Sequence, residues 1–149
     1  MSKTSVRIAL LSCAAALAAF GMSNAARALD GGAGQVVVTP LASTTSTASG
    51  QPITLPQKDV QVIVSSYEIP AGAQLPVHEH PFARYAYVLA GTLQVTNVET
   101  GKSHTYRPGD FIVEMIGQWH KAANVGGDPV RLLVIDQVEE GAQNTVLQK

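Results

Sequence analysis

The sequence predicts an all-β protein, a small sandwich or barrel of short strands. Segments rich in Val, Ile and Tyr recur from residue 60 onward, and Gly and Pro turns separate them at intervals of roughly 8–12 residues. No stretch shows a long apolar pattern of helical period. About 120 residues remain once an N-terminal leader is set aside, which suffices for one domain with its own core.

The first 28 residues have the layout of a secretory signal peptide. Lys3 and Arg7 form a short basic region, and an uncharged apolar run follows over residues 8–20. Small residues then mark two candidate cleavage points, which predict a mature start at Ala26 or Leu29. The apolar run is too short to anchor the chain in a bilayer. We therefore expect export to the periplasm or the extracellular space, with no membrane span.

Removal of this leader changes the charge and removes the only thiol. The whole chain has 10 basic and 11 acidic residues, and cleavage after Ala28 takes away Lys3, Arg7 and Arg27, which leaves seven basic residues against eleven acidic ones. A mildly acidic domain lacks the basic footprint of a nucleic-acid-binding protein. Cys13 also leaves, which excludes thiol catalysis and thiolate metal sites in the mature protein.

Turn-forming residues divide the remaining chain into an arm, a barrel and a tail. Residues 29–51 contain Gly-rich and Ser/Thr-rich runs and are expected to form a flexible N-terminal arm, with a short strand at residues 36–38. The barrel is expected over residues 52–139, and a polar C-terminal tail over residues 140–149.

Within the barrel, strand-like runs follow one another between turn residues. Gly91 alone separates two of them, which predicts a tight hairpin, and Pro108-Gly109-Asp110 predicts a turn. The expected strands are residues 61–69, 84–90, 92–98, 102–106, 111–116, 119–125 and 130–138.

His78 and His80 stand two residues apart, a spacing that suits a shared metal ion. Side chains two residues apart in a strand point to the same face of the sheet. Imidazole is also the commonest neutral ligand of first-row transition metals. On spacing alone, a solvated or hydrogen-bonded pair explains the pattern equally well.

Two spaced patterns around this pair resemble the two motifs of the cupin family, in the same order. The first consists of Gly72, His78, Glu79, His80, Arg84 and Gly91, and the second of Gly109, Asp110, Gly117, His120 and Asn124. The resemblance implies a double-stranded β-helix, the jelly-roll barrel of small single-domain bacterial cupins. It also implies a divalent transition metal (Fe, Mn, Zn, Ni or Cu) held by His78, His80 and His120. His104 lies outside both motifs and is expected at the surface.

One departure from the family pattern concerns Arg84, where cupins usually carry a Glu that supplies a fourth ligand. The parity of Arg84 matches that of His78 and His80, so an unbulged strand directs it into the same interior. A cation beside a dication is repelled. Arg84 must therefore turn outward, pair with a carboxylate or hold an anionic ligand.

Glu114 is the carboxylate that we expect near Arg84. Either Glu114 replaces the missing metal ligand, or it pairs with Arg84 and leaves a three-histidine site. The third alternative is that a local bulge turns Glu114 to solvent. Trp119 precedes His120 and either borders the substrate pocket or covers the barrel edge.

The sequence leaves three classes of function open. We favour an exported metal-binding cupin of unassigned substrate. The second class is a metal-dependent enzyme, either an iron dioxygenase acting on a small chelating substrate or an isomerase or lyase using another metal, with Arg84 clamping a substrate carboxylate. The third is a ligand-binding barrel without metal. A small-molecule ligand is expected in each case.

The resemblance also implies a homodimer. Small cupins frequently pair through an outer sheet or through exchanged N-terminal strands, and residues 36–38 are the segment of this chain suited to such an exchange.

Overall fold

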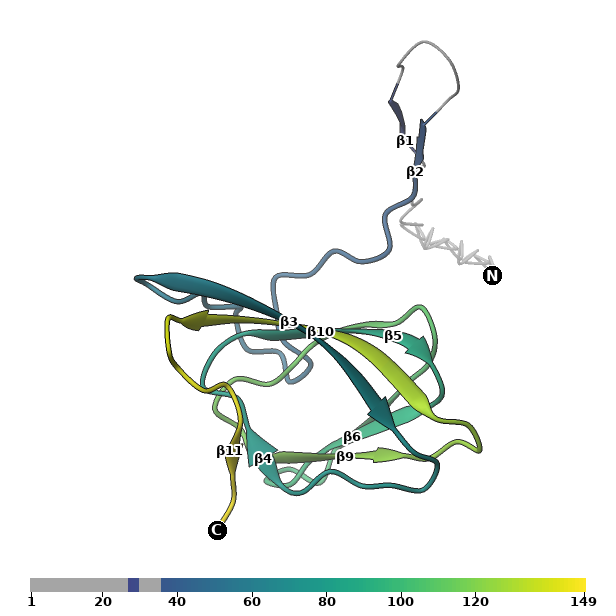
Figure 1. Cartoon of the computed structure of the whole chain (residues 1–149), viewed down its shortest axis with the longest axis vertical. Coiled ribbons are helices and arrows are strands. Elements are labelled where there is room, and N and C mark those ends of the chain that lie inside the picture. The colour runs from purple at the N-terminus through teal and green to yellow at the C-terminus, as the bar shows by residue number, and fades with distance from the viewer. Residues whose placement is uncertain (1–26, 30–35) are drawn as a thin grey trace, which may run out of the picture. The chain divides into compact units, whose positions relative to one another are not determined.

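The computed structural model describes residues 27–29 and 36–149, and every regular element within them is a β-strand (Figure 1). The predicted all-β class is therefore confirmed. The strands are β1 (Arg27–Leu29), β2 (Val36–Val38), β3 (Val60–Ile69), β4 (His78–Glu79), β5 (Arg84–Ala90), β6 (Leu93–Asn97), β7 (Ser103–Tyr106), β8 (Phe111–Val113), β9 (His120–Asn124), β10 (Val130–Glu139) and β11 (Val146–Leu147). Across these described residues, no helix has the length and apolarity needed to cross a membrane.

The chain divides into two units, each described by itself. The first unit ends at Pro40 and contains the antiparallel pair β1–β2, so a strand is present at residues 36–38 as predicted. The apolar run of the predicted signal peptide, residues 8–20, lies outside the described residues. The second unit, residues 41–149, contains all the other strands and all the candidate site residues.

The two sheets of the second unit pack around one apolar core. One has the strand order β3-β10-β5-β8 and the other β11-β4-β9-β6-β7. Figure 1 shows β3, β10 and β5 in one layer and β4, β6 and β9 in the other. Alternate residues of β10 point inward and are buried, because side chains alternate between the two faces of a strand. These buried apolar residues are Val130, Leu132, Val134 and Val138.

Gly91 carries the chain from one sheet to the other, and the predicted tight hairpin around it is wrong. β5 pairs with β10 and β8, whereas β6 pairs with β7 and β9. Gly91 has a φ of +80°, and a Cβ there would lie 2.7 Å from the carbonyl oxygen of Pro129. A glycine between two strand-like runs is the same local signal for a hairpin and for a crossing, because only long-range pairing distinguishes them.

The compact unit includes residues on both sides of the predicted barrel, residues 52–139. On the N-terminal side, Gln51 makes two hydrogen bonds with the backbone of Ile116, and the N–H of Ala48 donates to the carbonyl of Val113. On the C-terminal side, β11 pairs with β4. The segments before residue 52 and after residue 139 are attached mainly by hydrogen bonds. Their sequences therefore lack the apolar periodicity by which a strand is recognised.

Candidate metal centre

Neighbouring strands bring three histidines together inside the second unit. His78 on β4 lies directly opposite His120 on β9, so both side chains point to the same face. His80 follows β4, and its backbone forms an isolated parallel β-bridge with Ile116. The carbonyl of His80 accepts the N–H of Gly117 at 2.9 Å. All three side chains are buried, and their ligand atoms lie within 4.8 Å of one another. The three rings can therefore converge on one ion.

A backbone carbonyl holds each of the three rings in one tautomer. A carbonyl oxygen only accepts hydrogen bonds, so the Nδ1 that faces it carries the proton and donates. The pairs are His78 with Pro76 (2.7 Å), His80 with Asn144 (2.6 Å) and His120 with Gln118 (2.8 Å). Each Nε2 is thereby left with its lone pair, which is how proteins orient imidazoles for metal binding.

Burial also keeps the three imidazoles neutral. It lowers the pKa of His78 and of His120 below the ordinary value of 6.5. Burial, followed by the charge of Arg84, lowers the pKa of His80 to about 2. Because a metal binds the unprotonated ring, these rings need not lose a proton before they coordinate at neutral pH.

Glu114 is buried, with 8 % of its surface exposed, and one of its carboxylate oxygens faces the histidines. Oε2 of Glu114 lies 3.7 Å from Nε2 of His120, and neither atom has a hydrogen-bond partner among the described residues. Both are acceptors, because the proton of His120 is on Nδ1. Burial raises the pKa of Glu114. Two buried acceptors that face each other need a cation or a proton between them.

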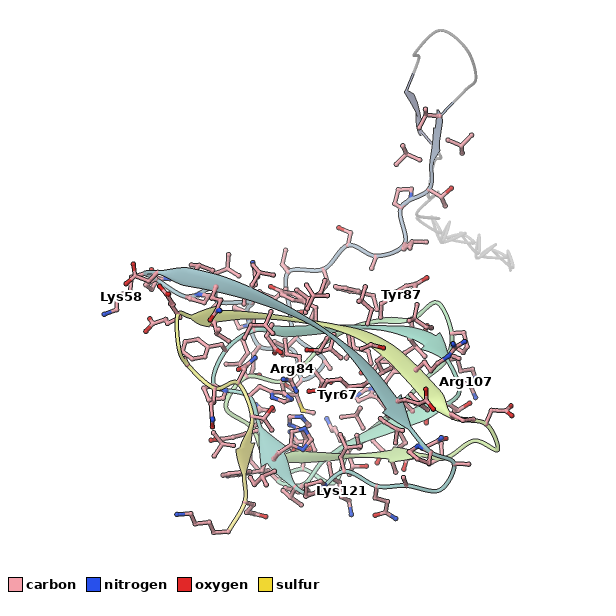
Figure 2. The ribbon with its side chains drawn as sticks, viewed as in Figure 1. Lys58, Tyr67, Arg84, Tyr87, Arg107 and Lys121 are labelled. Carbon is pink, nitrogen blue, oxygen red and sulfur yellow. The ribbon has the colours of Figure 1, made fainter. Side chains whose placement is uncertain are left out.

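Arg84 pairs with Asp136 on β10, which overturns the alternative in which Glu114 is the partner of Arg84. Nε of Arg84 donates to Oδ1 at 2.7 Å and Nη2 donates to Oδ2 at 3.0 Å, a buried bidentate pair. Burial alone lowers the pKa of Arg84, but the bonds and charge of Asp136 outweigh it and raise that pKa. Figure 2 shows Arg84 beside Tyr67 between the sheets, and its guanidinium carbon lies 5.8 Å from the centre of the Tyr67 ring.

Asp136 and Asn144 belong to the site and were not singled out from the sequence. Asp136 is buried two residues after Val134, and it accepts a hydrogen bond from Nδ2 of Asn144 at 2.6 Å. The alternation of β10 was the available signal, because a carboxylate at an inward position needs a buried partner. Asn144 lies in the segment expected as a polar tail, where no local pattern marks it.

The cavity beside the histidines is small and mostly apolar. Its volume is about 20 Å³, which is room for about one water-sized species. The polar lining consists of His78, His80, His120, Arg84, Glu114 and Tyr67. The apolar lining consists of Ile69, Leu75, Ala86, Leu93, Ala122, Leu132 and Val134.

Two further residues considered from the sequence lie outside this cavity. Trp119 is half-buried, and its carbonyl accepts the N–H of Val98 at 3.0 Å. His104 is exposed on β7, as expected, and lines a different cavity of about 440 Å³ together with Lys102.

The donor set fits a divalent transition metal. Three neutral imidazole nitrogens within 4.8 Å of one another form a set that Zn, Fe, Mn, Ni and Cu accept, and Oε2 of Glu114 lies 3.7 Å from one of them. Oε2 of Glu114 and Nε2 of His120, which have no hydrogen-bond partner among the described residues, are the ligand atoms that a metal ion would satisfy.

The comparisons with known proteins point to the same part of the chain. The family model described as "Cupin domain" matches residues 65–136, which include His78, His80 and His120. Comparison with the curated proteins finds no match.

Several solved structures are similar to this chain. The polyketide cyclase RemF from Streptomyces resistomycificus is 22% identical with a TM-score of 0.51, over 62% of this chain and 65% of the cyclase. The match thus spans slightly less than two thirds of the cyclase. BH2720 from Bacillus halodurans is 21% identical with a TM-score of 0.50, over 60% of this chain and 70% of its own. Oxalate decarboxylase from Bacillus subtilis, a protein with Mn(II) centres, is 22% identical with a TM-score of 0.48, over 58% of this chain and 23% of its own.

At these identities, a structural likeness establishes the fold alone. The family match agrees with the observed pair of facing antiparallel sheets. Residues 65–136 of this chain therefore match a cupin domain, and the two facing sheets have the cupin fold.

Proposed function

We propose that this protein is an exported metal-binding cupin in which His78, His80 and His120, joined by Glu114, hold one divalent transition metal. The observation that carries the proposal is the pair of buried acceptors, Oε2 of Glu114 and Nε2 of His120, that face each other at 3.7 Å without a partner among the described residues. A dication bound by both atoms would satisfy them and would offset the burial of the carboxylate.

The charges around the site favour a small anion as the bound ligand. Asp136 neutralises Arg84, and Glu114 neutralises one of the two charges of a divalent ion, which leaves one net positive charge in the site. Both hydrogen bonds of Arg84 to Asp136 use Nε and Nη2. Among the described residues no hydrogen bond involves Nη1, and Arg84 lines the cavity. Nη1 is therefore available to a ligand carboxylate.

A bound metal would supply Lewis-acid chemistry or, for iron, manganese or copper, redox chemistry. The chain's own residues would supply the dry apolar wall, the orientation of the three rings and the anion-binding nitrogen of Arg84. This set supports a metal-dependent enzyme, a dioxygenase, isomerase or lyase, as well as a non-catalytic metal-binding module. Substrate turnover separates the two, measured as oxygen uptake or product formation with a panel of small hydroxy acids, diketones and catechols.

The metal proposal is tested by metal analysis of purified protein. We expect about one equivalent of a transition metal per chain, or uptake of one equivalent of Zn²⁺ after chelation. His78→Ala, His80→Ala and His120→Ala should each abolish this stoichiometry, whereas the matched change His104→Ala should leave it intact. A chain that takes up no metal, with the cluster intact and the protein folded, would favour the barrel without metal.

Export and self-association are parts of the same proposal. The basic and apolar composition of residues 3–20 supports export and cleavage of a signal peptide. A homodimer is supported by the exposed apolar residues on the outer face of the β3-β10-β5-β8 sheet, among them Val62, Val64 and Leu133.

A further inference from the structure

We infer that the C-terminal strap, defined as residues 142–148, is a working part of the metal centre and that its docking is coupled to metal binding through Asn144. This inference rests on the proposed metal site. It assigns to the strap a role in metal affinity, and it makes Asn144 a positioning residue.

The first observation is that the strap holds both histidines of the H-x-H pair. Its strand β11 pairs with β4, and Leu147 lies directly opposite His78. Two residues before β11, the carbonyl oxygen of Asn144 accepts the Nδ1 proton of His80 at 2.6 Å. The strap therefore supports the backbone of His78 and the ring of His80.

The second observation is that β4 depends on this support. β4 contains only two residues, and on its other side it pairs with β9 through the single register pair His78–His120. Without β11 it would be a two-residue edge strand carrying His78, the first ligand of the site. Such short edge segments fray readily, because few hydrogen bonds hold them.

The third observation is that Asn144 connects the strap to the buried charges. Asn144 is 6 % exposed; its Nδ2 donates to Oδ1 of Asp136 at 2.6 Å, and its Oδ1 accepts the N–H of Phe82 at 2.8 Å. Asp136 in turn binds Arg84 through both carboxylate oxygens. One amide side chain thus ties the strap to the ion pair, while its own backbone carbonyl orients His80.

The fourth observation is that apolar burial contributes little to docking of the strap. Val146 and Leu147 are 40 % and 57 % exposed. The strap is held mainly by hydrogen bonds of Asn144, by the β11–β4 pair and by the bond from Gln148 N–H to the carbonyl of Val77 at 3.0 Å. An element held this way opens locally at low free-energy cost, so an added ligand at His78 and His80 can shift its equilibrium measurably.

These contacts define the coupling. In the docked state, Nδ1 of His80 donates to Asn144, and Nε2 is fixed toward the metal. In the undocked state the ring is free to rotate and to change tautomer. A metal that binds the docked state more tightly must stabilise docking by the same factor by which docking raises its affinity.

Two variants test the coupling with Zn²⁺ as the probe. Asn144→Ala removes the anchor, and Gln148→Ala makes the matched amide-to-methyl change at an exposed position of the same strap. We expect Asn144→Ala to weaken Zn²⁺ binding about tenfold to a hundredfold, the usual range for residues that orient a metal ligand, and Gln148→Ala to leave it unchanged. In the metal-free protein, the ¹⁵N spectrum of His80 should change from a single Nδ1-protonated tautomer to a mixture in Asn144→Ala only.

Hydrogen exchange of the unmodified chain supplies a measurement that requires no variant. Zn²⁺ should slow exchange of the strap amides by at least the factor by which Asn144→Ala weakens Zn²⁺ binding. Unchanged strap exchange on Zn²⁺ binding would overturn the inference, as would an Asn144→Ala variant that binds Zn²⁺ as tightly as the unmodified chain. Failure of the proposed function itself looks different, since the unmodified chain would then bind no Zn²⁺ and the coupling would fall with it.

Discussion

Of two buried carboxylates in this domain, Asp136 is paired with a cation and Glu114 is not. Asp136 receives two hydrogen bonds from Arg84 and one from Asn144, so its charge is fully compensated. Glu114 faces three neutral imidazoles with Oε2 unpartnered among the described residues. Since an uncompensated buried charge is costly, Glu114 stabilises the fold only when a cation joins it.

Glu114→Gln should therefore have opposite effects with and without metal. Burial raises the pKa of Glu114 in the folded state. The contribution of its protonation to stability is therefore complete below the unfolded value of 4.5 and is lost as pH rises through the folded pKa. At pH values above the folded pKa, Gln removes that penalty. We expect a higher melting temperature in chelator and a Zn²⁺ affinity lowered about tenfold or more.

The control for this change is Glu79→Gln, on the half-buried residue between the first two histidines. It should alter neither quantity. Melting curves recorded in chelator and in excess Zn²⁺ provide the measurement, and a lower melting temperature of Glu114→Gln under both conditions would contradict the argument.

The histidines predict how metal-free stability depends on pH. Their folded-state pKa values lie below 6.5, so the unfolded chain binds protons that the folded chain does not. Their stabilising contribution is full above about pH 6.5 and is lost as pH falls toward the folded values, about 2 for His80. Each histidine should contribute a slope of up to about 1.4 kcal/mol per pH unit.

Denaturant unfolding in chelator between about pH 7.5 and 5 measures this slope. His80→Gln should flatten it by the share of one histidine. An unchanged slope in that variant would mean that His80 does not stay neutral in the fold.

At the scale of elements, one connection decides which strands can meet. The crossing at Gly91 sends β5 and β6 into different sheets. Arg84 on β5 and Asn97, the β6 partner of His120, therefore lie on opposite walls of the same interior. The crossing requires a positive φ and close approach to Pro129 and Val130.

Gly91→Ala should destabilise the domain by more than the cost of a left-handed residue alone. That cost is about 1–2 kcal/mol, and the added methyl group would also meet the Pro129 oxygen and the Val130 Cα at 2.7 Å. Gly101→Ala is the matched control, because Gly101 has a φ of +70° but nothing within 4 Å of a Cβ. Urea unfolding of both variants should show the larger loss for Gly91→Ala; equal losses would mean that the close approach is not limiting.

At the scale of the whole molecule, the β3-β10-β5-β8 sheet presents an apolar outer face. Outward residues of neighbouring strands lie in register across it, with Leu133 opposite Tyr87 and Tyr87 opposite Phe111. Figure 2 places Tyr87 on the outer side of this sheet. Val62 and Val64 on the edge strand β3 are 56 % and 60 % exposed. A contiguous apolar face of this kind is typical of a protein–protein interface.

The mature protein should therefore be a homodimer in light scattering. Leu133→Lys, on the central strand β10 of this face, should give a folded monomer. Val125→Lys, at an exposed position after β9, should remain dimeric. A monomer at micromolar concentration before any substitution would reject the dimer.

The predicted export also belongs to this scale. Mass spectrometry of protein recovered from the producing cells should show a chain that begins at Ala26 or Leu29. An intact Met1 in the recovered protein would reject cleavage and would return Cys13 to the list of reactive groups.

Features that depend on local residue pattern could be predicted before the fold was known. Runs rich in β-branched and aromatic residues between Gly and Pro turns predicted strands at residues 84–90 and 130–138, which the structure contains as β5 and β10. The parity of His78 and His80 predicted that both would face one interior. Local parity also directed Arg84 inward, because side-chain direction in a strand follows from position alone.

The partners that those inward residues meet depend on long-range pairing between strands. Asp136 is 52 residues from Arg84, and Asn144 is 64 residues from His80. Alternation along β10 marks Asp136 as an inward carboxylate, but it does not say which cation Asp136 meets, and no local pattern placed Asn144 in the site. Long-range pairing of β10 with β5 and of β11 with β4 made both choices, because the register between strands is set by the packing of the whole sheet.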